Sequence, residues 1–298
     1  MLSIVIPYFS GLKDLKECIA SIQSQSDAQI IVVNDSSKIL TLNPKVKIID
    51  NKTTLGAAYS RNKGFLATKN DFILFADHDL VFQANAIKNL LEKSKSADII
   101  FPKVIYENGK VMHPIGKEKS QPQISACFLI KKSAATKLDE LFDENYKIYS
   151  EDSDFFLRCH LFNLKFKYVP KAILIHKLKY SYNNQRFYLE NKNLLYGWAK
   201  FLFIKKKGFI HPFKLSSWLS NFVCAIFNFD KFDWSHYDRS KKSFAKLKLL
   251  FRKHRKLSDK GSFFLLFQMF KAKISFLAVL PKALSKNLSL RKKINLKL

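Results

Sequence analysis

Apolar runs and amphipathic segments alternate over the first 180 residues of the chain. Uninterrupted apolar runs, typical of buried strands, occur at Leu2–Pro7, Ile30–Val33, Val46–Ile49, Phe72–Ala76 and Ile99–Val104. Segments with helical character separate several of them, at Lys13–Gln25, Gly56–Thr68 and Ala84–Lys95. This alternation predicts an α/β fold with a mostly parallel central sheet that helices cover on both faces.

The pattern becomes less regular beyond Gly116. Strands are expected at Ile124–Ile130, Tyr168–Pro170 and Ala172–His176, with a turn at Phe142–Glu144. A helix over Glu151–Asn163 would open with three acids, which favour the positive end of a helix dipole. Capping of the helix explains one or two of these acids easily but explains three less well. A functional role therefore remains an alternative for Glu151, Asp152 and Asp154.

The last third of the chain mixes Phe and Leu with Lys and Arg, and residues 201–298 are predicted to form a basic, amphipathic helical region. Lys242–Leu257 has one apolar face. The apolar stretch Gly261–Leu280 is interrupted by polar side chains, so no transmembrane helix is expected. Basic amphipathic helices of this kind lie in membrane interfaces; an ordinary helical region with solvated lysines is the alternative.

Composition limits the class of protein. The 298 residues include 28 Phe and 11 Tyr, which favours a sizeable core, and only 8 Gly and 8 Pro, which argues against a fibrous or disordered chain. The opening MLSIVIPYFS is interpreted as a first strand and not as a signal peptide. Four widely spaced cysteines predict reduced, buried thiols in the cytoplasm, with no disulfide framework or zinc site: Cys18, Cys127, Cys159 and Cys224.

Positive charge is concentrated in the C-terminal part. Residues 1–180 carry 26 Lys and Arg against 19 Asp and Glu, a net of +7, whereas residues 181–298 carry 26 against 5, a net of +21. A surplus of this size binds polyanions, either nucleic acid or the anionic leaflet of a membrane.

A functional site is indicated where the apolar run Phe72–Ala76 is followed by Asp77-His78-Asp79. Two carboxylates at the end of a buried strand repel each other, and a divalent cation that also contacts substrate phosphates would relieve that repulsion. A polar turn is the alternative, because Asp is common in turns. Pro7, Asp35 and Asp77 all follow strands whose tips share one edge of the sheet, the usual nucleotide crevice.

Several of these segments, in order, resemble the family 2 glycosyltransferases of the GT-A fold, in particular bacterial rhamnosyltransferases and galactofuranosyltransferases. The similar segments over residues 1–200 are IVIPYFSGLKDLKECIASI, IIVVNDSS, LGAAYSRNKG, FADHDL, SACFLIKKSA, LFDENYKIYSEDSDFFLR, YVPKAILIHKLKYS and LENKNLLYG. Residues 1–200 would then be the glycosyltransferase domain. The departures, which bear on nucleotide contacts and leave the carboxylates intact, are Asn34, Ser37, Thr54 and Ser125.

The resemblance implies roles on the donor side. Asp35 would accept a hydrogen bond from the imide of uracil or thymine, with Pro7 and Tyr8 lining the base pocket. Arg61 would pair with a phosphate or with the Asp-x-Asp acids, or form a purely structural salt bridge. The donor would therefore be a UDP- or dTDP-sugar.

The resemblance also implies a metal and a base. Asp77 would contact the ribose or the metal, and Asp79 and His176 would bind Mn²⁺ or Mg²⁺ directly. Asp152 would act as general base in a single inverting displacement, while Glu151, or less favourably Asp154, would position the acceptor.

The expected protein is thus an inverting, metal-dependent hexosyltransferase that acts on a saccharide or lipid-linked acceptor in cell-surface polysaccharide or lipooligosaccharide biosynthesis. It would lie in the cytoplasm, peripherally on the inner face of the cell membrane, and would not bind nucleic acid. Two other functions stay open at this point: a basic nucleic-acid-binding protein, and a sugar-nucleotide pyrophosphorylase, although PYFSGLK is poor in glycine for a triphosphate loop.

Overall fold

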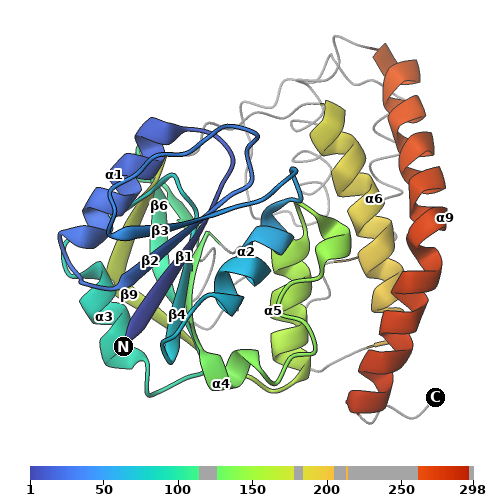
Figure 1. Ribbon diagram of the computed structural model, residues 1–298. Coiled ribbons are helices and arrows are strands. Elements are labelled where there is room, and N and C mark those ends of the chain that lie inside the picture. The colour runs from blue at the N-terminus through green and yellow to red at the C-terminus, as the bar shows by residue number, and fades with distance from the viewer. Residues whose placement is uncertain (114–125, 178–183, 205–212, 214–260, 295–298) are drawn as a thin grey trace. The chain divides into compact units, whose positions relative to one another are not determined.

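The computed structural model describes residues 1–113, 126–177, 184–204, 213 and 261–294 (Figure 1). The chain divides into two compact units, Met1–Lys179 and Tyr180–Leu298. The sequence placed the domain boundary at residue 200, whereas helix α6 (Asn184–Lys200) belongs to the second unit. Predicted features at Ile124, Ser125, Cys224 and Lys242–Leu257 lie outside the described residues.

The described residues of the first unit form a nine-stranded sheet. Its strands are β1 (Leu2–Tyr8), β2 (Gln29–Asn34), β3 (Val46–Asp50), β4 (Phe72–Ala76), β5 (Leu80–Phe82), β6 (Ile99–Tyr106), β7 (Val111–His113), β8 (Cys127–Lys131) and β9 (Phe166–His176). Its helices are α1 (Leu12–Gln23), α2 (Ala57–Leu66), α3 (Ala86–Lys93), α4 (Lys132–Ala135), the 3₁₀ turn η1 (Glu144–Tyr146) and α5 (Glu151–Leu161). The predicted helices and long strands are present, and β5, β7 and α4 were not predicted.

The sheet order is β3-β2-β1-β4-β8-β6-β9-β5, with β7 paired to β6. Parallel pairing links β3, β2, β1 and β4, as the alternation predicted. The other half is mixed: β8 runs antiparallel to both β4 and β6, while β9 is parallel to β6. The expectation of a mostly parallel sheet therefore holds for the N-terminal half only, because β8 enters the sheet at the edge where β4 ends.

Alternate residues of the central strands face two apolar layers. Ile4 and Ile6 pack with α1 and α3, whereas Val5 packs on the other face, where α2, α4 and α5 lie (Figure 1). The second layer is rich in aromatic rings, which contact one another at centroid distances of 4.8–6.4 Å: Phe75, Phe128, Phe142, Phe155 and Phe156. Cys18, Cys127 and Cys159 are buried free thiols, as predicted.

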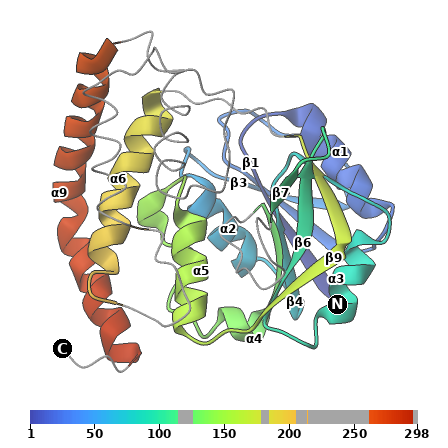
Figure 2. The same ribbon diagram turned by 180° about the vertical axis from the view of Figure 1, so that it is seen from behind.

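The second unit contains α6 and the long helix α9 (Gly261–Lys293), which lie side by side in both views (Figures 1 and 2). The Tyr188 hydroxyl donates to Ser275 Oγ at 2.7 Å. Asn287 of α9 donates through its amide to the carbonyls of Lys200 and Leu202, at 2.9 and 3.0 Å, so it satisfies acceptors at the end of α6. Among the described residues, no helix combines the length and hydropathy that crossing a bilayer requires.

Candidate active site at the carboxyl edge of the sheet

Three potential metal ligands meet beyond the end of β4. The chain leaves β4 at Ala76, passes through Asp77-His78-Asp79, and starts β5 at Leu80, which pairs with His176 at the end of β9. One ligand atom from each of Asp77, Asp79 and His176 lies within 4.8 Å of the other two. The structure thus brings together the residues that the sequence proposed as metal ligands, because β5 folds back against β9.

Electrostatics couple the three residues. His176 Nε2 lies 2.9 Å from Asp79 Oδ1. Burial alone would raise the pKa of Asp79, but the hydrogen bond and charge of His176 hold it below its ordinary value. For His176 the directions are reversed. Burial alone would lower its pKa, but the hydrogen bond and charge of Asp79 hold the pKa above its ordinary value. Burial raises the pKa of Asp77, although Arg61 opposes the shift.

The donor set suits a hard or borderline divalent cation. Two carboxylates and one imidazole are ligands that Mn²⁺ and Mg²⁺ accept, and three protein ligands leave positions for substrate oxygens. His176 Nδ1 lies 2.9 Å from Met112 Sδ, so Nε2 is the ring nitrogen that faces the carboxylates. The three residues therefore form a candidate metal site.

Arg61 joins this site to the start of α5. Its guanidinium donates to Asp77 Oδ1 at 2.9 Å and to Glu151 Oε1 at 2.8 Å. Arg61 and Glu151 are 4% and 7% exposed, and the guanidinium lies over the Phe142 ring, 5.4 Å from its centroid. Among the alternatives that the sequence left open for Arg61, the structure forms ion pairs with Asp77 of the Asp-x-Asp segment and with Glu151. Glu151 Oε2 is buried with no hydrogen-bond partner among the described residues.

The acids at the start of α5 have different environments. Asp154 is fully buried and accepts from Arg158 Nε at 2.6 Å, so it is part of an internal ion pair. Asp152 is half-buried, and its Oδ1 accepts from the Ser153 backbone N–H at 2.7 Å. The chain enters α5 through Lys147, Tyr149 and Ser150, which all have positive φ, at 57°, 66° and 68°. Such strained residues concentrate at functional sites.

Asp35 is 4% exposed at the carboxyl end of β2. Its Oδ1 accepts from Asn51 Nδ2 at 2.7 Å and from the Leu55 N–H at 2.8 Å. Its Oδ2 accepts from the Gly56 N–H at 2.8 Å, which leaves one lone pair on that oxygen. Asp35 therefore shapes the loop before α2 through these three hydrogen bonds.

Gly56 fits this loop because it has no side chain. Its φ is +98°, and a Cβ would lie 2.4 Å from the Lys147 carbonyl oxygen. We expect Gly56→Ala to destabilise the fold by at least about 2 kcal/mol, because both the backbone conformation and the contact are unfavourable. Urea unfolding measures this effect. Gly109→Ala is the matched control, since Gly109 has φ +76° with nothing within 4 Å, and an equal loss in both variants would contradict the contact argument.

Pro7 and Tyr8 lie at the end of β1, on the same edge of the sheet. The Tyr8 ring meets the His78 ring edge to face, with centroids 5.7 Å apart. Neither His78 nor Asn51 was predicted from the sequence to have a role. The position of His78 between Asp77 and Asp79 could have indicated that it lies at the site. By contrast, only the folded loop shows that Asn51 supports Asp35.

Two departures from the resemblance have local explanations. Asn34 donates from Nδ2 to Asp50 Oδ1 at 2.7 Å, and its Oδ1 accepts from the Ser36 hydroxyl at 2.7 Å. An aspartate at position 34 would place a second carboxylate against Asp50. Thr54 donates to the Asp35 carbonyl at 3.1 Å, so the shorter side chain still holds the loop.

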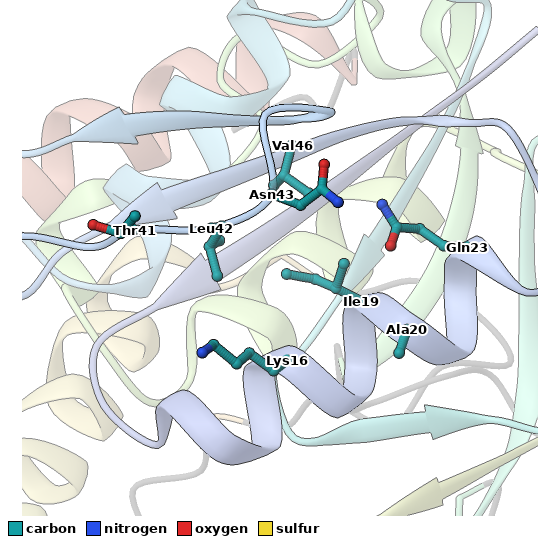
Figure 3. Close-up of a pocket in the computed structure, with 8 residues that line it drawn as sticks. All are labelled: Lys16, Ile19, Ala20, Gln23, Thr41, Leu42, Asn43 and Val46. Atoms are coloured by element: carbon teal, nitrogen blue, oxygen red, sulfur yellow. The ribbon is translucent and has the colours of Figure 1, made fainter.

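A small hollow of about 280 Å³ lies elsewhere on the first unit (Figure 3). It lies between one side of α1 and the segment that leads into β3, and its lining includes Lys16, Gln23, Asn43 and Val46. Val46 begins β3, whereas Asp50 at the other end of that strand lies beside Asn34. The hollow is therefore at the opposite edge from the candidate site and contains none of the proposed functional residues.

The sequence profile described as Glycosyl transferase family 2 matches residues 3–155, about half of the chain. The chain belongs to this family. The match includes Asp35, Arg61, Asp77, Asp79 and Asp152 but ends before His176, which joins the site through the pairing of β5 with β9.

Curated relatives of this family 2 protein come from several organisms. An uncharacterized glycosyltransferase of Haemophilus influenzae is 32% identical over 99 residues, 31% of this chain and 34% of the relative. Glycosyltransferase GlyG of Streptococcus pneumoniae is 26% identical, over 34% of this chain and 38% of the relative. An uncharacterized glycosyltransferase of Methanocaldococcus jannaschii is 24% identical, over 67% and 84%. The chain thus spans little more than a third of the first two relatives.

Among solved structures, S. aureus TarS shares the fold. The crystal structure of TarS residues 1–349 superposes with a TM-score of 0.52 at 18% identity, over 93% of this chain and 91% of that fragment. A second TarS structure with the same statistics contains UDP. This likeness supports the predicted GT-A fold of the family 2 protein, at the level of architecture.

Proposed function

We propose that this protein is an inverting, metal-dependent glycosyltransferase that uses a nucleoside-diphosphate sugar. The observation that carries the proposal is the bridge made by Arg61, which holds the Asp-x-Asp loop and the start of α5 together through two ion pairs under 3 Å. A candidate metal site and a candidate base thereby share one edge of the sheet, where α/β proteins bind nucleotides.

Each residue has a distinct task in this proposal. Asp77, Asp79 and His176 hold the cation, which when bound offsets the negative charge of the diphosphate leaving group. Asp152 accepts the proton of the acceptor hydroxyl while that oxygen attacks the anomeric carbon and the bond to the diphosphate oxygen breaks. A single displacement of this kind inverts the anomeric configuration. Asp154 takes no part, because Arg158 occupies it.

The donor base is proposed to be uracil or thymine. The free acceptor position on Asp35 Oδ2 suits the imide N–H of these bases, and Pro7 and Tyr8 end the adjacent strand. The UDP bound to TarS, a protein of similar fold, supports this choice. A donor-hydrolysis screen over UDP-, dTDP- and GDP-sugars with Mg²⁺ or Mn²⁺ tests it: turnover of GDP-sugars alone would exclude this role of Asp35.

Loss of a metal ligand gives a second test. Asp79→Ala and His176→Ala should each weaken binding of UDP in the presence of Mn²⁺ by at least about tenfold, because each removes a ligand atom. Binding measured by calorimetry in EDTA should change little. Asp71→Ala is the control, since Asp71 is an exposed acid just before the other end of β4. Donor hydrolysis that survives EDTA unchanged would refute the metal site.

The acceptor is proposed to be a saccharide, carried on a lipid at the cytoplasmic face of the cell membrane, in the biosynthesis of a surface polysaccharide or lipooligosaccharide. Glu151 is the candidate for positioning it, because its unpartnered Oε2 can accept a hydrogen bond. The net charge of +21 over residues 181–298 would attract the enzyme to anionic lipid, at about 1 kcal/mol per engaged Lys or Arg. Family membership favours this function over nucleic-acid binding and over a pyrophosphorylase.

A further inference from the structure

From Phe267 onward, where the structure describes side-chain burial, helix α9 has one buried and one exposed apolar stripe. The buried stripe contains Met269, Ala272, Phe276, Ala283 and Leu290, and the hydrogen bonds of Ser275 and Asn287 join α9 to α6 and the residues that follow it. The second stripe, here called the exposed stripe, consists of large side chains that are 42–60% exposed: Phe267, Phe270, Ile274, Leu277, Leu284 and Leu288.

The exposed stripe lies along one side of the helix. Its members follow one another at steps of three and four residues, with Pro281, also exposed, at the position between Leu277 and Leu284. Side chains at these steps are neighbours on a helix surface, and the stripe extends over roughly 30 Å at 1.5 Å per residue. Isolated exposed apolar residues are ordinary, whereas an aligned series of this length indicates a binding surface.

Charge defines what the exposed stripe can bind. The α9 sequence has no Asp or Glu, and its cations are Lys271, Lys273, Lys282, Lys286, Arg291, Lys292 and Lys293. Lys271 and Lys273 are exposed, and the Lys271 ammonium lies 5.7 Å from the centroid of the Phe267 ring. Lysine stems beside apolar surface extend their charged ends toward a polar layer. The matching partner is therefore apolar inside and anionic outside.

An anionic lipid surface has this arrangement, and other partners fit less well. A second copy of the chain would set two acid-free, cationic helices against each other. Nucleic acid would neutralise the lysines and leave six large apolar side chains in water. We propose that the exposed stripe of α9 inserts into the headgroup and acyl boundary of an anionic bilayer, with the helix parallel to the surface. This inference rests on the proposed function, whose lipid-linked acceptor lies at that surface.

Vesicle flotation of the full chain tests the proposal. The wild type should float with phosphatidylcholine vesicles that contain phosphatidylglycerol, and less with phosphatidylcholine alone. Phe270→Ser combined with Ile274→Ser should lower the partition coefficient at least about tenfold, because two large apolar groups no longer enter the lipid. Ile39→Ser combined with Leu66→Ser should not, although these side chains of the first unit are 97% and 81% exposed. Equal flotation of both double variants, or none of the wild type, would overturn the proposal.

Two further measurements separate the alternatives. Phe270→Trp should show fluorescence quenching by brominated lipid beyond that of the native tryptophans, and Leu66→Trp should not. Light scattering without vesicles should find the same mass for the wild type and for the stripe variant, which is the double variant Phe270→Ser and Ile274→Ser. If the wild type were a dimer that this variant dissociates, the stripe would bind a second copy of the chain, and the lipid assignment would be refuted. Donor hydrolysis without vesicles tests the enzymatic function separately, and it should be equal in the wild type and the stripe variant.

Discussion

Asp152→Asn is expected to reduce sugar transfer by at least about 10²-fold, the usual scale of general-base catalysis. The asparagine amide oxygen can still accept the hydrogen bond from the Ser153 N–H, so the start of α5 should keep its conformation. Because Asp152 is proposed to act only on the acceptor proton, binding of the nucleotide should change by less than about twofold. Transfer rates, calorimetric binding of UDP and urea unfolding measure the three quantities.

Asp154→Asn is the matched control for this experiment. Asp154 lies two residues further along the same helix, but it is fully buried in its pair with Arg158. Removal of one partner of a buried ion pair costs about 3–5 kcal/mol, so this variant should lose stability instead of the chemical step. A folded Asp152→Asn protein with near-normal transfer would show that another group takes the proton, and the assignment of Asp152 would then be wrong.

The sequence alone predicted much of the candidate site because strand ends are strongly constrained. Asp77 follows an apolar run, and His176 follows another, so a sheet with these strands parallel places both at one edge. The return of β5 onto β9, which brings Asp79 to within 2.9 Å of His176, involves only three residues and has no sequence pattern of its own. The sequence therefore predicted that these three residues lie close together, but the distances between them are known only from the folded structure.

The individual roles of the acids could not be separated from the sequence. Glu151, Asp152 and Asp154 all suit a helix start, and only the packed structure shows that Arg61 and Arg158 occupy the first and the last. The sequence also could not predict that β8 runs antiparallel to its neighbours, because an apolar run has the same composition in either direction. Both gaps concern contacts between residues far apart in the sequence, which local patterns do not contain.

The fold and the site also depend on each other through Arg61. Arg61→Met is expected to lower the free energy of unfolding by about 3 kcal/mol or more, because Glu151 would be left buried beside Asp77 with no cation between them. Transfer should fall as well, since the Asp-x-Asp loop and α5 lose their common anchor. Urea unfolding and the rate of sugar transfer measure the two effects. Arg61→Lys should recover only part of either, because a single ammonium cannot reproduce the two-armed contact of the guanidinium.

The double variant Arg61→Met with Glu151→Gln decides whether charge or packing causes the loss. If the uncompensated carboxylate is responsible, neutralising Glu151 should restore a substantial part of the stability even though the bridge is still missing. Transfer should stay low, because the amide cannot anchor the loop to α5. If the double variant is no more stable than Arg61→Met, the contact of the guanidinium with the Phe142 ring is the larger contribution, and the electrostatic account of the bridge fails. If Arg61→Met itself unfolds at the wild-type urea concentration, the ion pairs contribute nothing measurable, and Arg61 would have to act on substrate alone.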